Sequence, residues 1–236
     1  MIKEFLFENR QQLFAQLSKD CRNHLQHSLI ANESTSLLVS GGSTPAPLYE
    51  ALSKTDLDWQ RIHVALVDER WVNQDHEASN EALIRQTLLV NNALKAPFTG
   101  MKNSAASAKQ GQAETEVAYQ KLPKPFSVTL LGMGNDGHTA SLFPHAKGLE
   151  TALDEKNMQL TAAIIAKQSV VTGLNTERLT LTLTGLLQSE RLILLITGDE
   201  KLAVFRQAMS DGPVEDMPIR ALLRQNRVSF ELYWAP

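Results

Sequence analysis

The segment GMGNDGHTASLFP, from Gly132 to Pro144, carries the residues with the clearest chemical potential in the chain. Histidine transfers protons near neutral pH, and the carboxylate of Asp136, two residues before His138, could hold the imidazole in one tautomer. The segment also spells G-x-G-x-x-G from Gly132 to Gly137, the glycine pattern of dinucleotide-binding turns. It is therefore compatible with a dinucleotide cradle, a metal loop or a catalytic turn.

The surroundings of this segment favour the catalytic turn. A dinucleotide site needs a helix that opens on the last glycine and an acidic residue about 20 positions further on. Pro144 limits any helix after Gly137, and Asp154 and Glu155 do not end an apolar run. In a catalytic turn the glycines would let the backbone bend sharply after a strand, with Gly137 in a conformation that a Cβ would disfavour.

A second segment, SGGSTPAP at residues 40–47, has the composition of an anion-binding turn. Gly41 and Gly42 precede Ser43 or Thr44 as the helix N-cap, with Pro45 at the first helical position. Free backbone N–H groups and the positive end of the helix dipole would then face outward, and a phosphate is their natural guest. A plain capped turn without a ligand is the alternative.

Charged side chains follow two further apolar runs. Asp68 and Arg70 lie in DERWV, and Lys201 lies in TGDEK. Either cation alone could be an ordinary surface charge, but together they supply local positive charge in a chain whose net charge is −3. We expect them to lie beside the anion-binding turn.

The elements that position these segments alternate along the chain. Short apolar runs predict strands that are buried on both faces, as in a parallel sheet, at residues 36–40, 63–69, 127–132 and 192–198. Helix-like segments lie between them, and the long first one places Leu13, Leu17, Cys21, Leu25 and Leu29 on one face. The fold class expected is α/β, a doubly wound, mostly parallel sheet with helices on both faces. QLTAAIIA and RLTLTLTGLL predict further strands, and VSFELYWAP is expected to close the sheet edge.

This arrangement predicts one shared site. SGGSTPAP, DERWV, GMGNDGH and TGDEK each follow one of the four buried strands. Open α/β sheets bind ligands at the carboxyl ends of their parallel strands, so the four polar turns should line a single cleft.

Composition sets the remaining expectations. The 236 residues, 43% hydrophobic and 21% charged, suit a single globular domain over residues 1–236, a monomer or small homo-oligomer. The net charge gives no basic surplus for nucleic acid, and the sequence shows neither a signal peptide nor a membrane span, so a cytoplasmic protein is expected. The single cysteine of the chain, Cys21, is predicted to be a buried core residue. His24 and His27 lie three apart with no third ligand nearby, so no metal site is expected.

The motifs resemble those of the 6-phosphogluconolactonase family in their expected order: VSGGSTPAPLYEAL, VDERWV, SNEALIRQTLL, LLGMGNDGHTASLFP, RLTLTLTGLL and LITGDEK. The resemblance implies hydrolysis of 6-phospho-D-glucono-1,5-lactone to 6-phosphogluconate in the pentose phosphate pathway, without metal or organic cofactor. It implies His138 as general base with Asp136 as its neighbour. The substrate- and phosphate-binding residues would be Gly41, Gly42, Ser43, Thr44, Asp68, Arg70 and Lys201, with Arg178 as a further candidate for phosphate contact.

The residue types fit this chemistry independently. A lactone is an activated ester, so its hydrolysis needs a base with a pKa near the working pH and stabilisation of the developing oxyanion. No covalent nucleophile is required, and the serines lack the G-x-S-x-G setting that would indicate one. Asp136 either orients the imidazole or merely caps the turn.

Two alternatives remain open at this point. Glucosamine-6-phosphate deaminase/isomerases resemble the chain in the glycine turn, the acidic pair and the Asp-Gly-His turn, but they carry a glutamate where the alignment places Phe143. A sugar-phosphate sensor domain of a transcription regulator would use the same fold without turnover. Such a regulator needs a helix-turn-helix, and the residues before SLLVS are enough only for a strand and one long helix.

Overall fold

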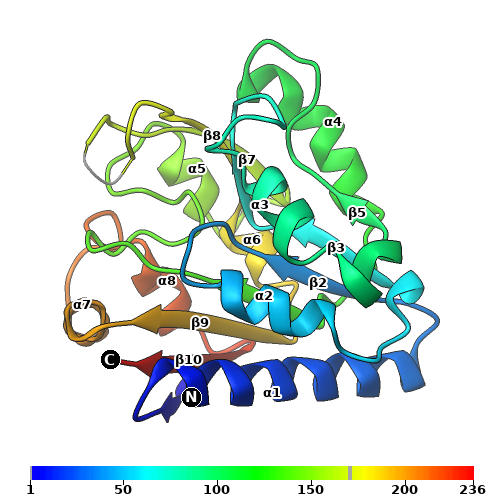
Figure 1. Cartoon of the computed structure of the whole chain (residues 1–236). Coiled ribbons are helices and arrows are strands. Elements are labelled where there is room, and N and C mark those ends of the chain that lie inside the picture. The colour runs from blue at the N-terminus through cyan, green and yellow to red at the C-terminus, as the bar shows by residue number, and fades with distance from the viewer. Residues whose placement is uncertain (1, 170–171) are drawn as a thin grey trace.

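The computed structural model describes residues 2–169 and 172–236 and shows two sheets of different character (Figure 1). The larger sheet has seven strands, all parallel. Their order is β1 (Ile2–Leu6), β10 (Ser229–Ala235), β9 (Arg191–Thr197), β6 (Val128–Leu131), β2 (Thr35–Val39), β3 (Ile62–Leu66) and β5 (Phe98–Thr99). The central strands are apolar and buried, as strands covered on both faces must be.

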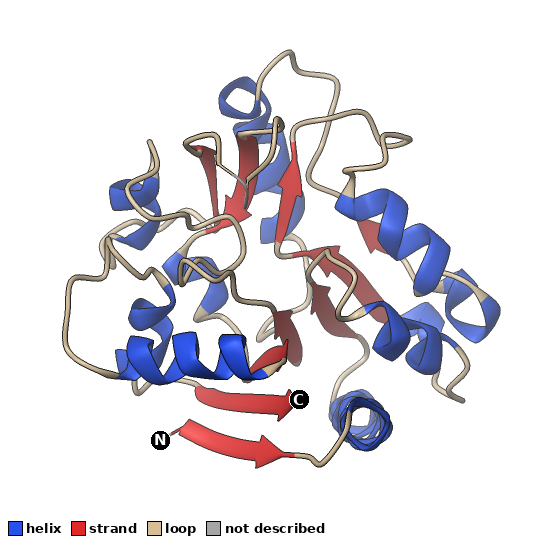
Figure 2. Ribbon diagram, turned by 60° about the vertical axis from the view of Figure 1, so that its left-hand side comes forward, coloured by secondary structure: helices blue, strands red, loops and turns tan. Residues whose placement is uncertain are grey.

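Helices cover both faces of this sheet, which confirms the doubly wound α/β fold class. In Figure 2 the helix that follows the N-terminal strand, α1, lies on one side of the lower strands, and α7 lies on the opposite side. Leu13, Leu17, Cys21, Leu25 and Leu29 are all buried on α1, so the predicted apolar face is confirmed. The α-helices are α1 (Arg10–Ala31), α2 (Ala46–Ser53), α3 (Asn80–Thr87), α4 (Ala108–Gln120), α5 (Leu149–Leu153), α6 (Leu183–Leu186), α7 (Asp199–Met209) and α8 (Ile219–Arg224), with 3-10 turns at Trp59–Arg61 and Asn91–Lys95.

The smaller sheet was not expected as a separate unit. It pairs β4 (Asp68–Arg70), β8 (Glu177–Leu181) and β7 (Thr161–Ile165) antiparallel. The run at residues 63–69 was predicted as one strand, but it divides at Val67. The N–H of Val67 donates to Val39 O of the large sheet, while its carbonyl accepts from Leu181 N of the small one. The chain therefore crosses between sheets just before Asp68.

The expectation that VSFELYWAP closes the sheet edge is wrong. β10 lies inside the sheet, because β1 pairs with its outer side in the register Ile2 to Phe230. The first and last strands of the chain are therefore neighbours, and because they run parallel the two termini lie at opposite ends of this strand pair (Figure 2). Periodicity alone does not reveal strand order, since β1 and β10 are joined only by long-range pairing.

Candidate active site

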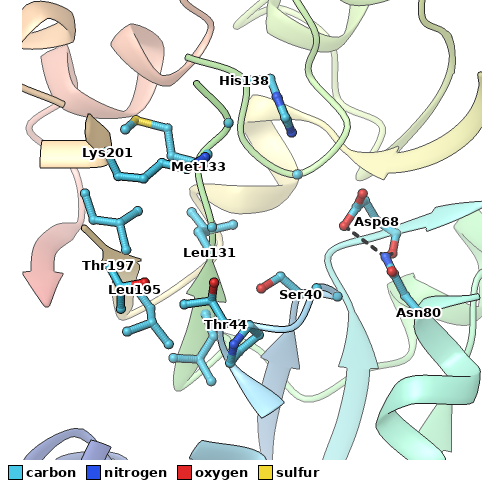
Figure 3. A pocket seen from close by; sticks show the side chains of 18 of the residues that line it. Ser40, Thr44, Asp68, Asn80, Leu131, Met133, His138, Leu195, Thr197 and Lys201 are labelled. Atoms are coloured by element: carbon cyan, nitrogen blue, oxygen red, sulfur yellow. Dashed lines mark hydrogen bonds between the residues drawn. The ribbon is translucent and has the colours of Figure 1, made fainter. Parts of the chain in front are cut away.

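A cleft of about 410 Å³ opens at the carboxyl ends of the parallel strands (Figure 3). The strand order changes direction between β2 and β6, because β2 leads to β3 on one side and β6 leads to β9 on the other. Ligands of open α/β sheets bind at such a switch point. All four polar turns contribute, which confirms that they share one site. The lining includes Ser40, Gly41, Gly42, Thr44, Pro45, Asp68, Arg70, Asn80, Gly132, Met133, Gly134, Asn135, His138, Ala140, Thr197 and Lys201.

The segment after β6 forms a compact turn. Gly134 N donates to His138 O at 2.9 Å, and Gly137 N donates to Gly134 O at 3.0 Å. Gly137 has φ +77°, a left-handed conformation that confirms the expectation for this glycine. A Cβ on Gly134 would lie 2.0 Å from His138 Nδ1, so only glycine lets the imidazole fold back here.

No α-helix opens on this turn in the described part of the chain. After β6 the next α-helix is α5, which begins at Leu149, well beyond Gly137. A dinucleotide pyrophosphate would need a helix N-terminus directly after the last glycine. The geometry therefore agrees with the interpretation of a catalytic turn and not with a dinucleotide cradle.

Asp136 and His138 are paired within the turn. Asp136 Oδ1 lies 2.5 Å from His138 Nδ1 and also accepts from His138 N at 3.1 Å. Burial opposes ionisation of Asp136, but the hydrogen bonds and charge of His138 outweigh it and lower the pKa of the carboxyl group. An ionised carboxylate only accepts, so Nδ1 carries a hydrogen toward Asp136. In a neutral imidazole this tautomer places the lone pair on Nε2.

The ring of Phe143 packs against the imidazole of His138. Its ring centroid lies 4.3 Å from that of His138 at an interplanar angle of 33°, and its side chain is buried. Arg178 Cζ lies 5.7 Å from the centroid of Phe143. Arg178 is buried, donates through Nη2 to Thr172 O, and is not among the residues that line the cleft. Burial, together with the neighbouring Arg70 charge, lowers the pKa of Arg178 to about 10.

The glycine turn after β2 lines the cleft through Gly41, Gly42 and Thr44. The predicted helix cap is wrong, because the N-cap position of α2 is Pro45 and no side chain caps the helix. Ser43 is not among the lining residues. Proline with φ −81° already has a helical backbone, so it starts the helix without a hydroxyl acceptor.

Lys201 enters the cleft from α7, where it extends toward Met133 (Figure 3). Its Nζ donates to Met133 O, which ties the start of α7 to the turn that carries His138. Burial lowers the pKa of the Lys201 ammonium, while Asp136 and Glu200 act in the opposite direction. An anionic ligand would stabilise the charged form further.

The opposite rim of the cleft is formed by Asp68, Arg70 and Asn80. Arg70 Nη1 donates to Asn80 Oδ1 at 2.9 Å and to Ala78 O at 2.8 Å. The carboxylate of Asp68 accepts from Ser141 Oγ at 2.6 Å. Asn80 was missed by the sequence analysis, since it lies inside a helical motif, SNEALIRQTLL, with no spacing that marks it.

Cys21 and His24 both lie away from the cleft. Cys21 is a buried free thiol whose pKa burial raises to about 12. His24 Nε2 lies 2.9 Å from Glu190 Oε2, so this histidine has a hydrogen-bond partner. Among the residues that the structure describes, no helix combines the length and apolar character needed to cross a bilayer.

Comparisons with known proteins agree with one another. A family model described as "Glucosamine-6-phosphate isomerases/6-phosphogluconolactonase" matches residues 8–234. A 6-phosphogluconolactonase of Rhizobium meliloti is 38% identical over 98% of this chain and 97% of its own, and one of Pseudomonas aeruginosa is 37% identical over 93% and 89%. The crystal structure of a 6-phosphogluconolactonase from Shewanella baltica superposes with a TM-score of 0.94 at 38% identity, covering 100% of this chain and 98% of that one.

Proposed function

The chain belongs to the glucosamine-6-phosphate isomerase/6-phosphogluconolactonase family, and on this premise we propose that it hydrolyses 6-phospho-D-glucono-1,5-lactone to 6-phospho-D-gluconate in the pentose phosphate pathway. The observation that carries the proposal is the Asp136–His138 pair in a cleft lined by cationic and glycine-rich turns. The relatives named as 6-phosphogluconolactonases cover nearly the whole chain, which supports the same substrate.

His138 acts as the general base of the reaction. Its Nε2 takes a proton from a water molecule while that water attacks the lactone carbonyl, and a tetrahedral oxyanion forms. The C–O bond to the ring oxygen then breaks, and the proton on Nε2 passes to the departing alkoxide, leaving the open acid. Asp136 stabilises the imidazolium that forms between these steps, and its hydrogen bond holds the ring in the reactive tautomer.

The phosphate group is held by the cationic residues and the glycine turn. Lys201 and Arg70 line the cleft, and the backbone N–H groups of Gly41 and Gly42 belong to the turn ahead of α2. Thr44 and Asp68 line the same cleft and are the further residues that contact the sugar phosphate. Arg178 and Ser43, which do not line the cleft, remain predicted contacts only. Phosphate binding positions the far end of the ring against His138.

The isomerase branch of the family is a poorer fit. Phe143 occupies the position where those enzymes carry a glutamate, and its ring packs on His138 instead of offering a second proton-transfer group. The sensor alternative is also disfavoured, because the relatives that match over most of the chain are named as enzymes. We further propose a cytoplasmic monomer or small homo-oligomer that uses no cofactor and binds no nucleic acid, in keeping with the net charge of −3.

The test of this proposal is acid release from freshly made 6-phosphogluconolactone. The rate with the protein, after subtraction of spontaneous hydrolysis, should saturate with substrate and survive exhaustive treatment with EDTA. A rate equal to the background would contradict the lactonase assignment. Loss of activity in EDTA that zinc or magnesium restores would contradict the cofactor-free mechanism.

A further inference from the structure

Asn80 joins three parts of the cleft that are far apart in the sequence. Its side-chain amide lies between the glycine turn after β2, Asp68 and Arg70, and Figure 3 shows it directed toward Asp68 at one side of the pocket. The residue is only 2% exposed, although it lines the cleft. A buried amide in this position must satisfy its polar atoms locally.

The oxygen of the Asn80 side-chain amide faces a hydrogen-bond donor, and its nitrogen faces hydrogen-bond acceptors. Asn80 Oδ1 accepts from Arg70 Nη1 at 2.9 Å, and Asn80 Nδ2 donates to Asp68 O at 2.8 Å, with Asp68 Oδ1 at 3.4 Å. An amide supplies an acceptor and a donor from one planar group. A carboxylate at this position would place a second acceptor against Asp68, and an aliphatic side chain would leave Arg70 without this partner.

The side chain of Asn80 also packs directly against Gly41 of the glycine turn. The three heavy atoms nearest to a Cβ built on Gly41 all belong to Asn80: Oδ1 at 1.8 Å, Cγ at 2.3 Å and Nδ2 at 2.9 Å. Gly41 does not have a positive φ, so its backbone would accept alanine. The need for glycine at this position therefore comes from the volume that Asn80 occupies.

The backbone of Asn80 is held in place as well. Asn80 N donates to Glu69 Oε1 at 2.8 Å, and the other carboxylate oxygen of Glu69 accepts from Glu81 N at 2.8 Å and from Ser79 Oγ at 3.1 Å. Glu69 is itself buried beside Asp68 and Arg70 in β4. The first turn of α3 is thus fixed to the strand that carries the rim residues.

We infer that Asn80 is the positioning residue that sets Arg70 against the glycine turn and thereby adapts the cleft to phosphorylated lactones. The inference rests on the proposed function, in which Arg70 contacts substrate phosphate. Asn80 acts through Arg70 and Gly41, so its removal weakens binding of the phosphorylated substrate and leaves the catalytic turn intact.

The kinetic test uses Asn80→Ala, Asn80→Asp and the control Ser79→Ala. Asn80→Ala should raise the KM for 6-phosphogluconolactone about tenfold, the contribution of a hydrogen bond to a charged group, with kcat changed less than about threefold. Asn80→Asp should raise this KM at least as much, because its carboxylate competes with phosphate for Arg70. Ser79→Ala removes the side-chain cap of α3 and one hydrogen bond to Glu69 but no contact to Arg70 or Asp68, so it should lower the melting temperature and raise KM much less than Asn80→Ala does.

Double variants show whether Asn80 acts through its two partners. Arg70→Ala with Asn80→Ala should raise KM no more than Arg70→Ala alone, because the shared contact is already lost. Gly41→Ala should destabilise the parent protein but have little effect on the melting temperature of Asn80→Ala, whose shorter side chain leaves room for the methyl group.

Each outcome bears on the inference. If Arg70→Ala raises KM while Asn80→Ala and Asn80→Asp do not, or if the losses simply add, the positioning role of Asn80 is overturned. If Arg70→Ala leaves KM unchanged, both this inference and the phosphate role of Arg70 fail, although lactone hydrolysis by the parent protein still stands. Absence of hydrolysis by the parent protein would instead overturn the proposed function itself.

Discussion

The two sides of the cleft are built in opposite ways. The side that carries the proposed base is a single turn, in which Gly134 N donates to His138 O and Thr139 Oγ1 donates to Gly132 O. The rim side joins Gly41, Asp68 and Asn80, and the carboxylate of Asp68 is held by Ser141, which lies 73 positions further on. The first geometry follows from neighbouring residues, whereas the second exists only after the fold has formed.

This contrast predicts that damage to the turn reduces the chemical step and that damage to the rim reduces recognition. His138→Ala should cause the largest effect, a fall in kcat of roughly 10²–10⁴, because that is the usual contribution of a positioned base. KM should change little, and His138→Gln should fail as well, since an amide cannot take a proton from water. Steady-state kinetics with 6-phosphogluconolactone measures both parameters, and near-normal kcat in His138→Ala would remove the base from the mechanism.

Gly134→Ala tests whether the shape of the turn matters as much as its histidine. The new Cβ would lie 2.0 Å from His138 Nδ1, so the imidazole must move. We expect kcat to fall by about 10²-fold, because a misplacement of about 1 Å has that cost. The comparison requires an unchanged circular dichroism spectrum. An active, folded Gly134→Ala protein would show that the turn tolerates a displaced imidazole.

Asp136→Asn should have a smaller effect within the same turn. The amide oxygen can still accept from Nδ1, so the tautomer is kept and only the charge that stabilises the imidazolium is lost. We expect kcat to fall about tenfold, by analogy with outer hydrogen-bond partners at metal sites. A loss as large as that of His138→Ala would show that the charge of Asp136, or the tautomer it fixes, matters to turnover as much as the imidazole itself.

Asp136→Asn should also change how the free energy of unfolding depends on pH. The pKa of Asp136 is lowered from its ordinary value of 3.8, so its ionised form stabilises the native state above the unfolded pKa. That stabilisation is lost as the pH falls through the lowered native pKa. The difference in free energy of unfolding between the parent protein and Asp136→Asn should therefore shrink below about pH 3.8, as denaturant titrations at several pH values would measure.

The sequence predicts which polar turns line the cleft. The buried strands end in polar turns, and the parallel arrangement brings those turns together, so the cleft and the placement of His138, Arg70 and Lys201 followed from the pattern. Gly137 was expected in a conformation that a Cβ would disfavour, because the backbone must bend sharply after the strand, and its φ of +77° agrees.

The parts that sequence reasoning missed depend on long-range contacts. β10 was placed at an edge, although its pairing with β1 buries it. The crossing at Val67 depends on carbonyl and N–H partners in two different sheets. Asn80 has no signal of its own, because its importance comes from Arg70 and Gly41, which it meets only in the folded chain.

Cys21→Ala should have the smallest effect on activity, since the residue lies in the α1 face and belongs to neither side of the cleft. We expect unchanged kcat and KM and a loss of about 1 kcal/mol in the free energy of unfolding, as for the removal of one buried methylene-sized group. With a pKa of about 12, the thiol should react slowly with a thiol reagent at pH 8 in the native protein. Rapid labelling would show that this core opens readily.

The division between turn and rim is tested most directly by the ratio of kcat/KM for 6-phosphogluconolactone to that for unphosphorylated gluconolactone. The ratio should be the same in His138→Ala as in the parent protein, because the base serves both substrates alike. In Arg70→Ala and Lys201→Ala it should fall at least tenfold, because only the phosphorylated substrate loses a charged partner. An unchanged ratio in both Arg70→Ala and Lys201→Ala, or a changed ratio in His138→Ala, would contradict the assignment of chemistry to His138 and of phosphate recognition to the two cations.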